Sequence, residues 1–210
     1  MKKKYILFDN DGVLVETEIW YYEASKRALK EFFDVDIEFD EYMKIMTAGK
    51  GVWVAAVDAS DEEKVIARNQ RDVYYQEYLR TKDISINNIH EILSQLQKKY
   101  KMGIVTTSRR VDFEIIHKNR GIVDFMEFVL CVEDYPKSKP HPDPYLKGLE
   151  LFNASKNETI IIEDSERGLI SANKAGIDCV IVHNDFTSSQ DFSTAKYKID
   201  NLSKLKTLLM

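Results

Sequence analysis

The chain has 210 residues, of which 44% are apolar and 31% are charged, and its formal net charge is −5. This length fits one large domain, or one domain with a smaller insertion, in a globular protein. The acidic balance, without a long basic block, disfavours nucleic acid or an anionic membrane as a partner, and no apolar run approaches the ~20 residues of a membrane helix.

The first predicted strand, Tyr5–Phe8, ends in two carboxylates, Asp9 and Asp11, followed by Gly12. In open α/β sheets, ligands bind at the carboxyl ends of the strands. Two acids at that edge repel each other and lose water, so we expect them to hold a cation, most simply a hard divalent metal ion. The alternative is an Asn-Asp-Gly turn whose acids are merely solvated.

Residues from about 16 to 82 read as helical. Apolar residues recur every three or four positions after Glu18, and Ser60 with Glu63 resembles a capping box that opens a helix to about Arg80. Residues 34–60 are mixed, and a loop is predicted at 48–51. This stretch therefore predicts a helical insertion that separates the first strand from the rest of its sheet.

After residue 82, strands and helices alternate. The predicted strands are Met102–Val105, Phe128–Val132, Thr159–Ile162 and Cys179–Val182. The predicted helices are one around Ile89–Leu96, then Val111–Asn119, Pro144–Phe152, Arg167–Ala175 and Leu202–Leu209. Apolar strands alternating with helices indicate a parallel sheet covered on both faces. We predict an α/β fold with a doubly wound, Rossmann-like parallel sheet as its core (1–14 and 83–210) and an inserted all-helical cap domain (15–82).

The two cysteines, Cys131 and Cys179, each lie in an apolar, strand-like run. We expect small core residues rather than a disulfide, and their spacing matches no metal site. Only four apolar residues follow the basic N-terminus, too few for the core of a signal peptide. A reducing cytoplasm fits this pattern, so we expect a cytoplasmic protein.

Polar clusters also follow two of the later predicted strands. Thr106, Thr107 and Ser108 offer hydroxyls and backbone N–H groups at the start of a helix, either as an anion site or as an ordinary helix cap. Lys139 opens a loop with three prolines (139–144), where it either steadies a phosphate among carboxylates or faces solvent.

Glu163 and Asp164 directly follow three isoleucines. Burying either acid without a partner is costly, which favours a functional role. The alternative is capping of the next helix by Asp164 or Ser165.

Together, these motifs resemble those of the haloacid dehalogenase-like hydrolases. The similar subgroup has a small helical cap after the first strand and includes phosphoglycolate-phosphatase-like and β-phosphoglucomutase-like proteins. The resemblance covers nearly the whole chain and rests on residues 9–14, 105–107, 139–143 and 163–168. The cap is similar only in helical character and length, and Asn10 stands where related proteins often carry an apolar residue.

The resemblance implies a phosphatase that hydrolyses a small phosphate monoester. Asp9 is then the nucleophile that forms an aspartyl-phosphate, and Asp11 protonates the leaving alcohol and later activates water. The resemblance also implies Mg²⁺ as cofactor. Its ligands would be the Asp9 side chain, the Asp11 backbone carbonyl and Asp164, with Glu163 bound directly or through water. The phosphoryl group would be held by Thr106, by the N–H of Thr107 and by Lys139.

Lys50 lies in the 48–51 loop, where related caps often present a substrate loop; the alternative is a solvated surface turn. The cap carries no motif that identifies a substrate, so sugar phosphates, phosphoglycolate and nucleotides all stay open. The roles of Arg109 and Arg110 are also open. The expected partner is a small phosphorylated metabolite, not nucleic acid or a membrane, and we expect a monomer or a weak dimer.

Three other functions are weighed against the phosphatase. A sugar phosphomutase of the β-phosphoglucomutase type would carry a His early in the first cap helix, and residues 18–22 contain none. A dehalogenase would lack the second acid, because a halide leaves without a proton, so Asp11 argues against it. A phosphate-binding module without turnover is disfavoured by the complete set of site residues.

Overall fold

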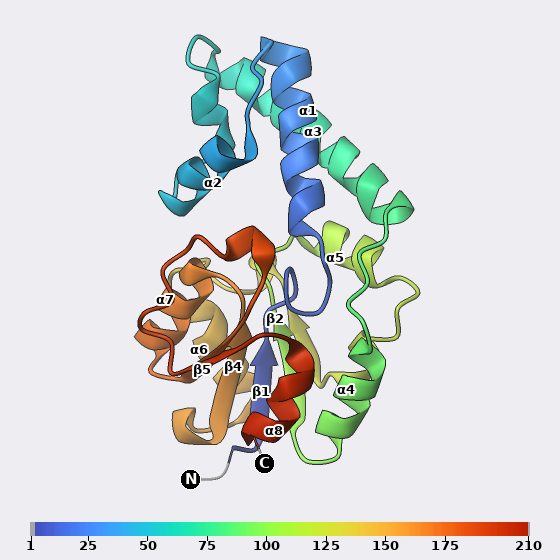
Figure 1. Ribbon diagram of the computed structural model, residues 1–210, viewed down its shortest axis with the longest axis vertical. Helices are drawn as coiled ribbons and strands as arrows, with labels where there is room; N and C mark the ends of the chain where they lie inside the picture. Colours follow the sequence, from blue (N-terminus) through green and yellow to red (C-terminus); the bar gives the residue numbers. More distant parts are fainter. Residues whose placement is uncertain (1–2, 210) are drawn as a thin grey trace. The chain divides into compact units, whose positions relative to one another are not determined.

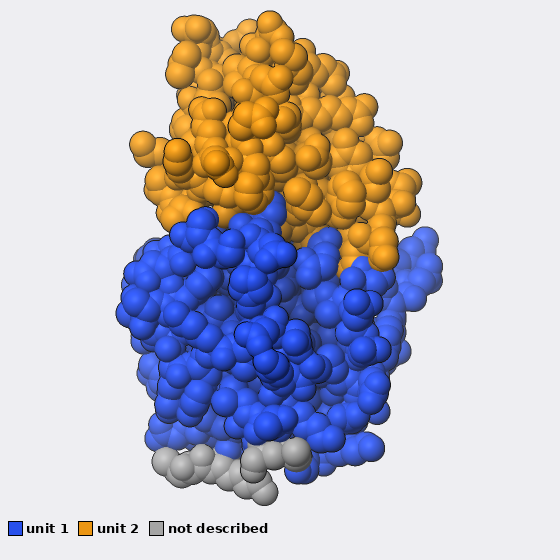
Figure 2. Space-filling view, viewed as in Figure 1, with its two compact units in different colours: residues 1–16, 85–210 blue, residues 17–84 orange. Residues whose placement is uncertain are grey.

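The computed structural model describes residues 3–209. The chain divides into two compact units, coloured separately in Figure 2. The first, here the α/β unit, joins the segment that ends at Glu16 to the segment that begins at Ser85; the second, here the helical unit, spans Thr17–Ile84. The boundaries predicted after residues 14 and 82 each lie two residues before those of the compact units.

The α/β unit is built on a six-stranded sheet in which every neighbouring pair is parallel. Its strands are β1 (Tyr5–Phe8), β2 (Lys101–Val105), β3 (Phe128–Leu130), β4 (Thr159–Glu163), β5 (Asp178–Val182) and β6 (Tyr197–Ile199). Their spatial order is β3-β2-β1-β4-β5-β6, which confirms the doubly wound, Rossmann-like sheet. The order reverses between β1 and β4, and the carboxyl ends at such a switch point form the usual ligand crevice.

Helices cover both faces of this sheet. They are α4 (Ile89–Gln97), α5 (Arg110–His117), α6 (Asp143–Phe152), α7 (Glu166–Ala175) and α8 (Leu205–Leu209). Figure 1 shows α6 and α7 on one side of β1 and α4 and α8 on the other. Leu7 of β1 packs in one cluster with Tyr145 of α6 and Leu169 of α7. Gly148 lets α6 approach closely, since a Cβ there would lie 2.9 Å from the Leu7 side chain.

Most predicted elements of this unit are confirmed within one or two residues, with three differences. Strand β6 was not predicted, because it has only three residues and pairs at the edge of the sheet with β5. The strand predicted to reach Val132 ends at Leu130, and Val132–Asp134 forms a 3₁₀ turn. The last predicted helix begins with a 3₁₀ turn, Leu202–Lys204. Both cysteines are buried free thiols, as predicted.

The helical unit, which the structure describes throughout, contains helices and no strand. It comprises α1 (Glu18–Phe33), α2 (Phe39–Thr47), a 3₁₀ turn (Val52–Ala55) and α3 (Asp61–Thr81). The predicted capping box of α3 is confirmed: the Ser60 hydroxyl accepts the Glu63 N–H at 3.2 Å, and the Glu63 carboxylate accepts the Ser60 N–H at 2.8 Å. Helices α1 and α3 pack through aromatic contacts such as Tyr21 against Tyr75.

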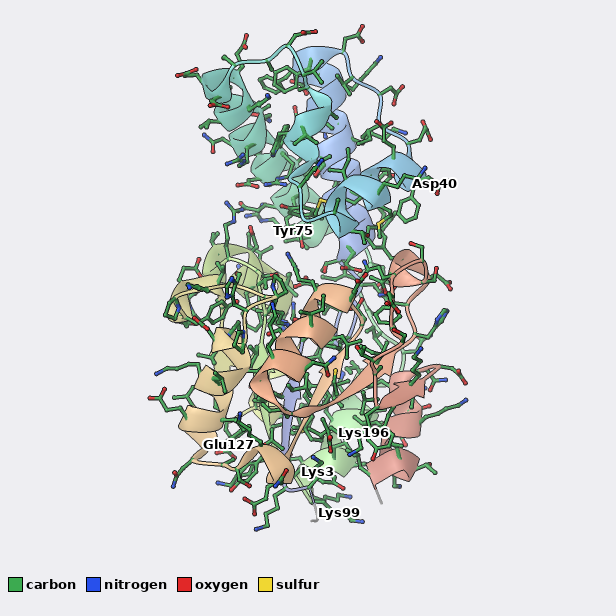
Figure 3. All side chains as sticks on the ribbon, turned by 90° about the vertical axis from the view of Figure 1, so that its left-hand side faces the viewer. Lys3, Asp40, Tyr75, Lys99, Glu127 and Lys196 are labelled. Atoms are coloured by element: carbon green, nitrogen blue, oxygen red, sulfur yellow. The ribbon has the colours of Figure 1, made fainter. Side chains whose placement is uncertain are left out.

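Ion pairs that are partly or fully open to solvent lie at the amino ends of the strands. Lys3 and Lys196, labelled in Figure 3, both pair with Asp178, at 2.8 and 2.9 Å, and Lys4 pairs with Glu158 at 2.6 Å. Such pairs remain in water and contribute little to stability. Elsewhere, no helix among residues 3–209 has the length and hydropathy that a bilayer crossing needs.

Candidate active site

The turn after β1 carries the first two candidate acids. It is closed by the Asn10 carbonyl, which accepts the N–H groups of Val13, Leu14 and Val15 at 3.2, 2.8 and 3.2 Å. Gly12 has φ +76°, and a Cβ there would lie 2.0 Å from Asp164 Oδ2. A glycine is therefore required for the turn to approach the end of β4.

Lys139 lies inside this edge of the sheet and not in solvent, since only 4% of the residue is exposed. Its Nζ lies 2.9 Å from Asp9 Oδ1 and 2.7 Å from Glu163 Oε1, and it donates to the Val105 carbonyl at 3.0 Å. Burial alone would lower the pKa of Lys139, but Asp9 and Glu163 raise it above its ordinary value. The site therefore holds a fixed positive charge between two carboxylates.

Glu163 is fully buried, and both of its oxygens accept hydrogen bonds. Oε1 accepts from Lys139 and from the Tyr145 hydroxyl at 2.6 Å. Oε2 accepts the N–H groups of Asp164 and Ser165 at 3.1 and 3.3 Å, and the Ser165 hydroxyl at 3.0 Å. Burial alone would raise the pKa of Glu163, but Lys139 and these hydroxyls lower it overall, so Glu163 remains a carboxylate.

The pKa of Asp9 is shifted in the opposite direction to that of Glu163. Burial and the neighbouring charges of Glu163 and Asp11 raise its pKa to about 7, against the attraction of Lys139. Its Oδ1 also accepts the Asn10 N–H at 2.8 Å. A second cation beside Asp9 would favour the ionised form and lower this pKa, because opposite charge stabilises a carboxylate.

Asp11 is held by hydroxyl groups from the segment after β2. Asp11 Oδ2 accepts from Thr106 Oγ1 at 3.1 Å and from Ser108 Oγ at 2.6 Å. The Ser108 N–H in turn donates to Thr106 Oγ1 at 3.0 Å. These hydroxyls do not cap α5, whose N-cap residue is Arg109. Ser108 was predicted together with the two threonines as an anion site or a helix cap, but its contact with Asp11 was not predicted.

The remaining predicted residues lie in different surroundings. Thr107 is half-buried, and its hydroxyl accepts from Arg167 at 3.2 Å. Lys50 is exposed, after α2 in the helical unit, and its contact with substrate stays a prediction. Arg109 and Arg110 form local ion pairs, with Asp112 and Asp134 respectively.

Ser165 does cap α7: its hydroxyl accepts the Gly168 N–H at 3.1 Å. Of the two residues predicted as alternative caps of this helix, Ser165 is therefore the cap. Asp164 lies one residue earlier and is almost fully buried.

Three carboxylates at this edge could hold a metal ion. Asp9, Glu163 and Asp164 each offer an oxygen atom, and these atoms all lie within 4.8 Å of one another. Oxygen-only ligands suit a hard divalent cation such as Mg²⁺. The five donors on Glu163 direct its oxygens to other groups, so Asp9 and Asp164 fit direct ligation best, with Glu163 as outer support.

Asn184, in the loop after β5, orients Asp164 and was missed by the sequence analysis. Its side-chain amide donates to Asp164 Oδ2 at 3.1 Å and to the Gly12 carbonyl at 3.4 Å. The Thr187 hydroxyl donates to the Asp164 backbone carbonyl at 2.7 Å. No motif surrounds Asn184, so only the packing of β5 beside β4 identifies it.

Known proteins resemble the chain over almost its full length. Residues 6–182 match the family model described as haloacid dehalogenase-like hydrolase. Pyrophosphatase PpaX of Bacillus mycoides is 26% identical, and the match covers 100% of this chain and 98% of that protein.

Two solved structures share the fold. A predicted phosphoglycolate phosphatase from Haemophilus somnus superposes with a TM-score of 0.85 at 22% identity, covering 100% of this chain and 99% of that one. CbbY from Rhodobacter sphaeroides, crystallised with phosphate, gives a TM-score of 0.81 at 18% identity, covering 97% and 96%. With the match of the family model, these findings establish that the chain belongs to the haloacid dehalogenase-like hydrolases.

Proposed function

We propose that the protein is a Mg²⁺-dependent phosphatase that works through an aspartyl-phosphate on Asp9. The observation that carries this proposal is the buried Lys139, whose ammonium group lies 2.9 Å from Asp9 Oδ1. A fixed positive charge beside a nucleophilic carboxylate suits phosphoryl transfer, in which positioning and charge stabilisation supply most of the catalysis.

In the first step, the Asp9 carboxylate attacks phosphorus while the bond to the leaving oxygen breaks. Lys139 offsets the negative charge of the phosphoryl oxygens, and the Thr107 N–H and the Thr106 hydroxyl are the proposed donors to them. The Thr106 hydroxyl donates to Asp11 Oδ2 at 3.1 Å, so a bound phosphate would compete with Asp11 for that hydrogen.

Asp11 is the proposed general acid and base. It gives a proton to the leaving oxygen and then takes one from the water that hydrolyses the aspartyl-phosphate. The Ser108 hydroxyl, which donates to Asp11 Oδ2 at 2.6 Å, is the contact proposed to keep it in one orientation for both steps. Preorganisation of this kind lowers the barrier because no side chain has to be reoriented at the moment of reaction.

The proposed metal ligands are Asp9, Asp164 and the backbone carbonyl of Asp11. When bound, Mg²⁺ neutralises charge on the carboxylates and on the phosphoryl oxygens. Glu163 orients Lys139 and the start of α7, and Asn184 orients Asp164.

The substrate class is a small phosphate ester or pyrophosphate. Pyrophosphate is included because the similar curated protein from Bacillus mycoides is named a pyrophosphatase, and phosphoglycolate because similar structures carry that name. A sugar phosphomutase is not favoured, since residues 18–22 contain no His and both relatives are named for phosphate hydrolysis.

The test measures release of inorganic phosphate by the purified protein from p-nitrophenyl phosphate, pyrophosphate and phosphoglycolate, with a β-glucose 1-phosphate arm for mutase activity. We expect activity with Mg²⁺, loss with EDTA and recovery when Mg²⁺ is restored. Full activity in rigorously metal-free protein would contradict the metal role. Silence of the Mg²⁺-loaded protein across the panel would contradict the phosphatase.

A further inference from the structure

A buried polar pair lies directly beside the catalytic turn. Asn10, between Asp9 and Asp11, is fully buried, and its Oδ1 lies 2.7 Å from Nε2 of His117, the last residue of α5. Amide oxygens only accept, so Nε2 carries the hydrogen and donates. Burial lowers the pKa of His117 to about 4, with Asp11 opposing and Arg120 adding to the shift, so the imidazole is neutral at neutral pH.

Stability does not explain this pair. Among residues 3–209, neither Asn10 Nδ2 nor His117 Nδ1 has a hydrogen-bond partner. Buried polar atoms are almost always bonded, and an unsatisfied one destabilises the fold. Apolar side chains of the same shape would avoid that cost, and local rules of this kind are usually broken at functional sites.

Asn10 is also the centre of the turn. Its N–H donates to Asp9 Oδ1 at 2.8 Å, and its carbonyl accepts the three N–H groups that close the turn, those of Val13, Leu14 and Val15. A movement of the Asn10 peptide would therefore move the Asp9 carboxylate and the start of the Asp11 backbone together. The side chain of Asn10 ties this peptide to α5.

Helix α5 and the segment before it hold two residues of this turn, Asn10 and Asp11. Ser108, just before α5, fixes the Asp11 carboxylate, and His117, at the end of α5, fixes Asn10. The Phe113 ring lies 4.3 Å from the His117 ring and limits its orientation. Each contact joins residues that are far apart in sequence, by 97 and 107 positions, and both restrain the same turn.

We propose that Asn10 and His117 form a positioning pair that holds the turn bearing Asp9 and Asp11 in its reactive geometry. The catalytic consequence rests on the proposed phosphatase function, whereas the structural consequence for the turn does not. Two measurements therefore separate the two ideas: steady-state kinetics, and hydrogen exchange of the turn amides.

The variants are chosen in matched shapes. His117→Gln keeps an N–H donor toward Asn10, while His117→Met has a similar length and no donor. Asn10→Leu keeps the branched shape and removes the acceptor. The double variant Asn10→Leu/His117→Met removes every unsatisfied polar atom of the pair, so it stays usable if a single variant fails to fold.

We expect kcat to fall about 10- to 100-fold in His117→Met, Asn10→Leu and the double variant, because a small misplacement of reacting groups costs this much. We expect KM to change little and His117→Gln to keep most of the wild-type kcat. The double variant should melt at or above the wild-type temperature. Amides of Asn10 and of 13–15 should exchange at least about tenfold faster in the donor-free variants, with β4 and β5 unchanged.

The pairing is overturned if His117→Met and His117→Gln behave alike, or if the folded double variant keeps wild-type kcat. Unchanged protection of the turn amides also overturns it, and that result can be read whether or not the wild-type protein releases phosphate. A wild-type protein that is inactive on the whole panel, yet loses turn protection in His117→Met, would reject the proposed phosphatase and keep the pair.

Discussion

The two edges of the same parallel sheet use the same residue types in opposite ways. At the amino edge, Lys196 pairs with Asp178, and their side chains are 53% and 31% exposed. At the carboxyl edge, Lys139 pairs with Asp9 and Glu163, and these side chains are 1%, 12% and 0% exposed. The first set is solvated, and the second is almost removed from water.

The two sets of ion pairs differ in burial, and this difference indicates different roles. An exposed pair has little effect on stability and is screened by salt. A buried ion pair loses its hydration. A protein with well-packed apolar residues in place of such a pair is therefore often equally stable or more stable. Charges retained at such a site act instead as a preorganised electrostatic environment, which is what transfer of a phosphoryl group requires.

The largest effect is expected for Asp9→Asn. Because the amide cannot form the acyl-phosphate, turnover should fall by about 10³-fold or more. The melting temperature should stay near that of the wild type, since the site disfavours an ionised Asp9, as its pKa of about 7 indicates. Phosphate release and thermal denaturation measure the two quantities. A purified variant with unchanged turnover would remove Asp9 as the nucleophile.

Lys139→Met and Lys196→Met compare the edges directly. The first leaves Asp9 and Glu163 without their buried cation, and breaking such a pair costs about 3–5 kcal/mol of unfolding free energy. The second removes an exposed partner of Asp178 and should leave the denaturant midpoint unchanged within error. Chemical denaturation of both variants measures their unfolding free energies and denaturant midpoints. Equal destabilisation by the two substitutions would show that burial does not distinguish the edges.

A pH effect is expected from His117. Its folded-state pKa of about 4 lies below the ordinary value of 6.5, so the unfolded chain binds a proton more readily between these values. Stability is therefore retained above pH 6.5 and lost as the pH falls toward 4, by about 3 kcal/mol.

Other groups titrate in the same range, so the measured quantity is the difference between wild type and His117→Gln across pH 4–7 in denaturant titrations. His183→Gln, which removes an imidazole whose side chain is 57% exposed, is the control for replacing a histidine at the surface. A His117→Gln protein with the full wild-type pH dependence would show that the buried imidazole is not responsible.

The smallest effect is expected for Tyr145→Phe. The substitution keeps the packed ring and removes only the hydroxyl that donates to Glu163 Oε1 at 2.6 Å. The carboxylate keeps its other donors, so the loss should be about 1.5–3 kcal/mol, the range for a hydrogen bond to a charged group. Urea unfolding measures it, with Leu149→Ala as a cavity-forming comparison on the same helix. A larger loss than in Leu149→Ala would make the hydroxyl a main support of the site.

Much of the fold was readable in advance because its signals are local. Three consecutive isoleucines predicted β4, and the pattern around Ser60 predicted the start of α3. Strand β6 was missed because three residues at an edge carry too little periodicity. The candidate acids were found because each directly follows a strand whose apolar run ends abruptly.

The contacts that orient those acids could not be predicted from the sequence. Ser108 contacts Asp11 across 97 positions, and His117 contacts Asn10 across 107. Such contacts depend on how helices and loops pack around the sheet. The same holds for Glu163, where only the structure reveals five donors on one carboxylate.

The sequence by itself determined most of the strands and helices, and which acids, lysine and hydroxyl groups follow the strands, because periodicity and turn chemistry act between near neighbours. Tertiary structure decided that Lys139 is buried, that Glu163 is saturated with donors and that Asn10 is tied to α5. Burial and hydrogen-bond partners arise only when distant segments pack together, and these two factors set the charge of each group at the site.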